Sequence, residues 1–222
     1  MKYHLDHLPE VKAAIAAAAD CATIDELQAA IRAFDANPLC LTPAMPGGPG
    51  ERCASPNPVM ILGKAPAGTE TETRVPFSGP AGRVLREQMA LAGFDIEACW
   101  ITCATPWRAR KDNTPNATQI ALSRPFLYRE IEIVAPSVII ALGDKATEAL
   151  FQSHAYSVEA AGTEMTLEMG ETKTPVLVML NHAYVMYNPP ERAHVFKRHL
   201  AEAARRHPDA FDRIACDHGM AA

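Results

Sequence analysis

The sequence predicts an α/β fold: a single three-layer α/β/α domain with a central, mainly parallel sheet of four to five strands. Short apolar runs such as "VMIL" at 59–62 and "SVIIALG" at 137–143 indicate buried strands, because both faces of a parallel sheet are covered. Segments with helical spacing of apolar residues, such as "RVLREQMALAGF" at 83–94, stand between these runs. Strands that alternate with helices are typical of a parallel sheet with helices on both faces.

The first half of the chain predicts N-terminal helices, a long connection and the first strand. Residues 1–36 should be helical, with Thr23 and Glu26 as a capping box. Residues 35–58 are rich in proline and glycine, which favours a long ordered loop or a spacer. The strand at 59–62 is followed by a loop and by a helix at 82–91, which Gly93 terminates.

The second half continues the alternation. We expect a strand at "CWITCAT", a helix from 116 to 135 that is interrupted or kinked near Pro125, the strand at 137–143 and a helix from Asp144. Residues 158–180 predict a hairpin-like pair of edge strands and then a buried strand at 175–180. A loop and a long helix follow from 181, and residues 206–222 are expected to be a frayed tail of the single domain, which spans 1–222.

Composition excludes some classes of protein. The 222 residues contain no apolar run near the roughly 20 residues of a membrane span, and the N-terminus lacks a signal-peptide pattern, so we expect a cytoplasmic protein without a membrane partner. Six scattered cysteines without a C-x-x-C pair favour reduced thiols. The formal charge of −5 does not indicate nucleic-acid binding, although a local basic face suffices for it. We expect a monomer.

Several motifs together identify a family. "GKAP" follows the strand at 59–62, "PFSGPAG" precedes a helix, "ITCATPWR" includes the end of the next strand, and "IEIVAPSVIIALGDKATEAL" and "NHAY" with a later "NP" come after it. Over residues 23–205 this order resembles the uracil-DNA glycosylase superfamily, and most closely its family 4. The resemblance implies base flipping and hydrolysis of the N-glycosidic bond, with damaged DNA as the partner and free uracil as a product.

The resemblance also implies a base-binding set. Phe77 matches the phenylalanine that stacks on the extruded base, although a lone phenylalanine is often an ordinary core residue. Cys103 replaces the asparagine that pairs with uracil. Because a thiol is a weak donor and acceptor, this favours relaxed specificity towards deaminated or damaged bases, unless Cys103 is only a buried strand residue. The full base-binding set is Gly63, Ala65, Pro66, Ala67, Phe77, Ser78 and Cys103.

The expected catalytic residues are Lys64, Asn181 and His182. Lys64 stands where the family has an acid, and Glu70 matches a later acid. A lysine here could stabilise an anion, orient the water, bind a phosphate, act as an amine nucleophile, or merely be solvated or paired with Glu70 or Glu72. Asn181 occupies the position of the family's catalytic histidine, and His182 that of the following proline. Either side chain could donate a hydrogen bond to the departing base oxygen.

Two further expectations concern DNA and cofactors. Five basic residues could contact phosphates or could form a solvated basic turn: Arg83, Arg86, Arg108, Arg110 and Lys111.

Family 4 usually carries an iron–sulfur cluster, whose cysteine positions fall here at Asn37, Cys40, Trp107 and Ser123. Since a cluster needs about four thiolates or comparable donors, we expect no cofactor and no metal, and Trp107 could fill the vacated volume.

The sequence therefore favours a monofunctional DNA glycosylase of base excision repair. The departures at Lys64, Cys103 and Asn181 leave an alternative, a non-catalytic protein of the same fold that binds DNA or a base. A third candidate, supported by the net negative charge, is a pocket for a free nucleobase or nucleotide.

Overall fold

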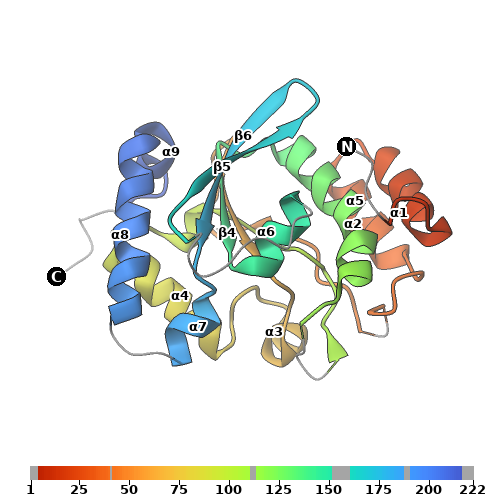
Figure 1. Cartoon of the computed structure of the whole chain (residues 1–222), viewed down its shortest axis with the longest axis horizontal. Helices are drawn as coiled ribbons and strands as arrows, with labels where there is room; N and C mark the ends of the chain where they lie inside the picture. Colours follow the sequence, from red (N-terminus) through yellow and green to blue (C-terminus); the bar gives the residue numbers. More distant parts are fainter. Residues whose placement is uncertain (1–4, 41, 111–113, 152–160, 188–190, 217–222) are drawn as a thin grey trace.

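The computed structural model of this protein describes residues 5–40, 42–110, 114–151, 161–187 and 191–216. Within them a central sheet has helices on both faces, which confirms the predicted α/β fold (Figure 1). The sheet has six strands in the order β1-β3-β2-β4-β6-β5. Its four inner strands are parallel: β2 (Val59–Gly63), β3 (Trp100–Cys103), β4 (Val138–Leu142) and β6 (Thr172–Met179).

The sheet is wider than the predicted four to five strands because an antiparallel strand lies at each edge. β1 (Gly48–Pro49) pairs with β3, and β5 (Glu164–Met169) pairs with β6. The first comes from the proline-rich segment 35–58, which the sequence predicted to be a loop or spacer. A proline is tolerated in such an edge strand because one side of the strand has no neighbouring strand. The missing N–H on that side therefore costs no hydrogen bond of the sheet.

Alternating side chains of the inner strands build two apolar layers. Val59 and Ile61 face α4 (Pro80–Leu91), α8 (Glu191–Arg206) and α9 (Pro208–Asp212). Met60 and Leu62 face the opposite layer, formed by α5 (Ala117–Val134) and α6 (Asp144–Phe151). This period of two follows from the pleat of a strand, and burial on both faces explains the continuous apolar runs in the sequence.

A third apolar cluster holds the N-terminal helices against the outer side of α5. These are α1 (Pro9–Ala19) and α2 (Ile24–Ala33), which pack around Trp107 and Phe126. The capping box of α2 is present, since the Thr23 hydroxyl accepts the N–H of Glu26 and the Glu26 carboxylate accepts the N–H of Thr23. No helix among the described residues combines the length and apolar character needed to cross a membrane.

Three local predictions are wrong. The sequence predicted two edge strands and then a separate buried strand at 175–180. The second edge strand and the buried strand are one strand, because β6 runs without a break through Pro175. Pro175 lies just before the pairing with β4 begins at Val176, so its missing N–H leaves the inner ladder intact. The interruption predicted near Pro125 is absent, because α5 is continuous through this proline and residues on both sides of it pack against the sheet.

The predicted frayed tail is the third. Residues 208–216 are ordered by α9 and by a bridge between Phe94 and Ala215, and the Phe211 ring packs edge-on against Phe94 at 5.1 Å. Both Phe211 and Ile214 are buried. Residues 217–222 lie outside the described part of the chain. Apolar side chains separated by polar ones, as in "AFDRIA", were the only local sign of this docking.

A buried carboxyl group on α5 supports the strand that leads to the site. The Glu130 side chain accepts hydrogen bonds from Trp100 Nε1 at 2.7 Å and from the Thr102 hydroxyl at 2.9 Å. Gly47 lies so close that a Cβ there would stand 2.0 Å from Glu130 Oε1. Burial raises the pKa of Glu130 to about 7, although both hydrogen bonds act in the opposite direction.

We expect Glu130→Gln to remove part of the pH dependence of stability. The folded pKa of Glu130 lies above the unfolded value, so its favourable contribution is complete below about pH 4.5 and is lost as the pH rises through about 7, by roughly 3 kcal/mol. Glutamine stays neutral and keeps an acceptor for Trp100. Urea unfolding at about pH 5 and about pH 7.5 measures this difference. Exposed Glu132→Gln on the same helix is the control, and an unchanged slope in Glu130→Gln would contradict the assignment.

Candidate active site

A cavity of about 430 Å³ opens at the carboxyl ends of β2, β3 and β6. In Figure 1 this is the end of the sheet near the short helices α3 (Gly68–Thr73) and α7 (His182–Tyr187). Open α/β sheets bind ligands at this end, and the volume is in the range of small-molecule sites. The lining residues are Met45, Lys64, Ala65, Pro66, Ala67, Gly68, Thr69, Glu70, Pro76, Phe77, Pro80, Ala81, Cys103, Asn181, His182, Ala183 and Met186.

The turn before α4 places an aromatic ring at the cavity wall. Phe77 has a φ of +52°, a left-handed conformation that costs a non-glycine residue roughly 1–2 kcal/mol. Two glycines make this arrangement possible. A Cβ at Gly82 would lie 2.0 Å from the Phe77 carbonyl oxygen, and one at Gly63 would lie 2.8 Å from the Phe77 ring. The Phe77 side chain is 7% exposed and also belongs to the core next to α4.

Glu70 holds the two ends of the same loop together. Its carboxylate accepts the N–H of Gly79 at 2.8 Å and the N–H of Ala67 at 3.1 Å. Glu70 is 8% exposed, so these two hydrogen bonds satisfy a shielded charge. The acid that the resemblance matched is therefore bound to backbone groups on both sides of the loop, which stiffens the wall that carries Phe77.

Asn181 and His182 enter the cavity directly after β6. The Asn181 side-chain oxygen accepts the N–H of Ala183 at 2.9 Å and so begins α7, while a Cβ at Gly143 would lie 2.8 Å from Asn181 Cβ. The His182 ring stands edge-on to Phe77, with centroids 5.1 Å apart and an interplanar angle of 78°. Among the described groups, His182 Nδ1 has no hydrogen-bond partner.

Burial, and then the neighbouring Lys64 ammonium, lowers the pKa of His182 to about 4. The ring is therefore neutral near pH 7, with one nitrogen as donor and the other as acceptor. Lys64 is the first residue after β2, and its carbonyl accepts the N–H of Thr105 at 3.3 Å. A positive charge and a neutral imidazole thus lie at one cavity, where an anion would meet both.

Cys103 ends β3 beside Gly63, its partner across the ladder. A Cβ at Gly63 would lie 3.3 Å from the Cys103 sulfur. Burial raises the pKa of Cys103 to about 12, so the side chain is a neutral thiol. It presents a weak donor and a weak acceptor to the cavity rather than a charge.

Most of the residues expected at the site line this cavity: Lys64, Ala65, Pro66, Ala67, Phe77, Cys103, Asn181 and His182. Gly63 and Ser78 are not among the lining residues: a Cβ at Gly63 would meet the Phe77 ring and the Cys103 sulfur, and the Ser78 hydroxyl is hydrogen-bonded to Thr73 Oγ1 at 2.7 Å. Met45 also lines the cavity, although it was not expected there; it comes from the segment 35–58 and donates its N–H to the Pro106 carbonyl. No local pattern marks Met45, because its place depends on a contact between distant segments.

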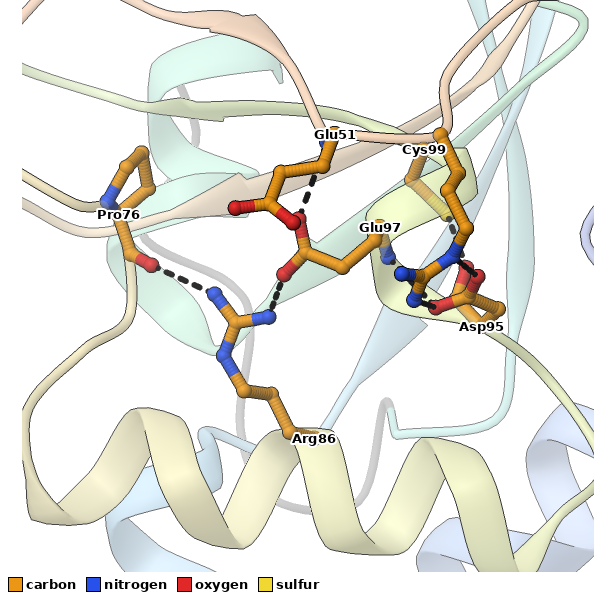
Figure 2. Close-up of polar contacts among 7 residues, drawn as sticks. Glu51, Pro76, Arg86, Asp95, Glu97 and Cys99 are labelled. Carbon is orange, nitrogen blue, oxygen red and sulfur yellow. Dashed lines mark hydrogen bonds and ion pairs between the residues drawn. The ribbon is translucent and has the colours of Figure 1, made fainter.

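The four expected phosphate-binding residues within the described part of the chain do not all point to one surface. Arg86 points towards Glu97 and Pro76: its guanidinium pairs with the Glu97 carboxylate and donates to the Pro76 carbonyl, which disfavours the expected phosphate contact (Figure 2). Arg83 is exposed and donates to the Ser78 carbonyl at 3.3 Å, and Arg110 is exposed. The Arg108 guanidinium lies beside Gly68 at the cavity. Lys111 lies outside the described residues.

The four positions that match cluster cysteines contain a different set of groups. The Asn37 amide donates to the Ser123 hydroxyl at 3.2 Å, and both residues are buried. Trp107 and Cys40 belong to the apolar cluster on the outer side of α5, where the Cys40 thiol donates to the Phe34 carbonyl. An amide, a hydroxyl and an indole are not the thiolates that hold an iron–sulfur cluster, so these residues do not fit one.

We expect protein purified without oxygen and treated with iron and sulfide to remain colourless. Its melting temperature should not change with a chelator, because the Asn37–Ser123 hydrogen bond and the Trp107 ring already fill this region. Metal analysis and visible absorbance measure this. Stoichiometric iron with acid-labile sulfide would show that other residues hold a cluster.

Comparisons with known proteins identify the family of this chain. The model of the uracil DNA glycosylase superfamily matches residues 49–205. The chain is 35% identical over 104 residues to the type-4 uracil-DNA glycosylase of Pyrobaculum aerophilum. The aligned residues cover 47% of this chain and 53% of that protein. The corresponding enzyme of Archaeoglobus fulgidus is 26% identical over 165 residues, covering 70% of this chain and 82% of that protein.

A third relative is the type-4 uracil-DNA glycosylase of Saccharolobus solfataricus, 30% identical over 139 residues, or 60% of this chain and 64% of that protein. The matched stretches thus span between 53% and 82% of these relatives. Because the family's own model matches well over half of this chain, the chain belongs to the uracil-DNA glycosylase superfamily.

Proposed function

We propose that this protein is a uracil-DNA glycosylase, a hydrolase that removes uracil from DNA in base excision repair. The observation that carries the proposal is the cavity at the sheet end, which combines the Phe77 ring, the neutral His182 and the Lys64 charge in a chain of this superfamily. The relatives named as type-4 uracil-DNA glycosylases support the choice of substrate.

In the proposed reaction, the target nucleotide leaves the duplex and its base enters the cavity. The base stacks on the Phe77 ring, which the left-handed turn holds at the wall. Arg108, which lies beside Gly68, and the exposed Arg83 and Arg110 would contact phosphates, which makes binding salt-sensitive.

Bond rupture leaves electrons on the base and positive charge on the sugar. The N–H of the neutral His182 ring and the Asn181 amide donate hydrogen bonds to the base oxygen that gains charge, and the Lys64 ammonium lowers the energy of the same anion. Water then adds to the anomeric carbon and loses a proton, and the uracil anion takes up a proton from solvent. The products are an abasic site and free uracil, so no covalent bond to Lys64 is needed.

The decisive experiment uses a labelled oligonucleotide that contains one uracil, with a thymine strand as the control. Alkali-sensitive cleavage at the uracil position supports a glycosylase, and binding in a gel-shift assay without cleavage would select a non-catalytic DNA-binding protein. A parallel reaction with borohydride tests Lys64 as an amine nucleophile. A trapped adduct that is lost in Lys64→Ala would replace the monofunctional mechanism with a Schiff-base mechanism.

We propose further that base selection is relaxed, because the neutral thiol of Cys103 cannot form a bidentate pair with the uracil edge. Cys103→Asn is expected to raise the preference for uracil over hypoxanthine and xanthine by roughly tenfold, since an amide supplies one donor and one acceptor. Excision rates on a panel of oligonucleotides measure this preference. An unchanged panel would remove Cys103 from base recognition.

A further inference from the structure

A charged cluster outside the cavity contacts the turn that carries Phe77. Arg86 does not itself line the cavity, and it projects from α4 towards the 3-10 helix Ile96–Ala98 (Figure 2). One of its terminal nitrogens is ion-paired with the Glu97 carboxylate, and the other donates to the Pro76 carbonyl at 2.9 Å. The Arg86 side chain is 28% exposed and that of Glu97 is 19% exposed, so solvent screens this pair little.

The contact at Pro76 acts on the residue that follows. The Pro76 carbonyl belongs to the peptide plane that joins Pro76 to Phe77, so fixing this oxygen limits rotation about the N–Cα bond of Phe77. That bond has the strained φ of +52°. On the far side of the turn, Glu70 holds the N–H of Gly79 at 2.8 Å. The strained residue is thus held by charged groups on both sides.

Glu97 is itself anchored. Its second oxygen accepts the N–H of Glu51 at 3.2 Å, and its own N–H donates to the Asp95 carboxylate at 3.0 Å. A carboxylate with these contacts is a fixed acceptor for the arginine. Since a planar guanidinium presents several donors in a rigid fork, it can bridge the fixed carboxylate and the Pro76 carbonyl at once.

We propose that Arg86 is a positioning residue that holds the Phe77 ring in place through the Pro76 carbonyl, rather than a residue that contacts DNA. The proposal rests on the proposed function only for its readout in excision. Loss of the bridge would let the turn relax towards unstrained backbone and move the ring from the cavity wall.

Arg86→Lys is the sharpest variant. Lysine keeps a positive charge beside Glu97 but cannot bridge two acceptors in the same way, so the fold should survive while the hold on Pro76 is lost. We expect roughly 10- to 100-fold slower single-turnover excision at saturating enzyme, with an unchanged dissociation constant for DNA. The matched control is Arg52→Lys, because Arg52 pairs with Asp95 in the same cluster and is 60% exposed.

A double-mutant cycle with Phe77→Ala identifies the route of the effect. If Arg86 acts through the ring, the double variant should be no slower than Phe77→Ala alone. Additive losses would overturn the proposal, and so would weaker DNA binding with an unchanged rate at saturation, which is the result expected of a phosphate contact. The melting temperatures of all variants show whether a slower rate is caused by a loss of folded protein.

A measurement that does not depend on catalysis tests the positioning role of Arg86 separately from the proposed function. With ¹⁵N-labelled phenylalanine, the Phe77 amide signal is identified by its absence in Phe77→Ala. It should shift in Arg86→Lys and remain in place in Arg52→Lys. A Phe77 signal unmoved in Arg86→Lys would overturn the positioning role even in a protein that excises no base.

Discussion

Replacing His182 with alanine is expected to lower single-turnover excision of uracil by about 100- to 1,000-fold, the effect of removing one donor to a developing oxyanion. DNA affinity should change little, because the ring acts on the base anion that forms as the bond breaks. The pKa of about 4 keeps this ring neutral, so its titration should not alter the rate between about pH 5.5 and about pH 8. Rapid-quench measurements with excess enzyme check both points.

Asn181→Ala tests the second donor to the base oxygen, the Asn181 amide, while the His182 ring is retained. Its oxygen caps the N–H of Ala183, so this variant removes both a possible donor to the base and the start of α7. We expect slower excision here too, with some loss of stability. Exposed His194→Ala on α8 is the matched control for the histidine. Full activity in both His182→Ala and Asn181→Ala would place the active site elsewhere.

Phe77→Ala is expected to slow excision by about 5- to 150-fold, because stacking of one base on an aromatic ring contributes roughly 1–3 kcal/mol. The ring also belongs to the core, so the free energy of unfolding should fall by roughly 3–5 kcal/mol. Both quantities need measurement, since a partly unfolded variant would also excise slowly.

A pair of leucine variants distinguishes these effects. Phe77→Leu retains much of the apolar volume but has no flat face, so excision should fall more than stability does. Phe94→Leu removes a ring that packs on Phe211, on the layer of α8 and α9, and should lower stability without slowing excision of saturated DNA. Equal rates in Phe77→Leu and the parent would show that Phe77 acts only as a core residue.

Much of the fold was predictable because its signals are local. The apolar run at 59–62 is a strand buried on both faces, and the capping box at Thr23 and Glu26 begins a helix. Each depends on residues close in the chain. Three features could not be predicted: the edge strand β1, the continuity of β6 and the docking of α9. Each depends on contacts between distant segments. These contacts stabilise a structure that the prolines or polar residues of the segment disfavour.

The sequence by itself determined which side chains could meet at the cavity, since motifs that directly follow parallel strands converge at one sheet end. Lys64 follows β2, Cys103 ends β3 and Asn181 follows β6. The direction of the long charged side chains was decided only by the tertiary structure. Arg86 turns towards Pro76 and Glu97, and Glu70 joins two backbone segments. A flexible charged side chain takes the direction of its strongest partners, and folding, rather than local pattern, brings those partners near.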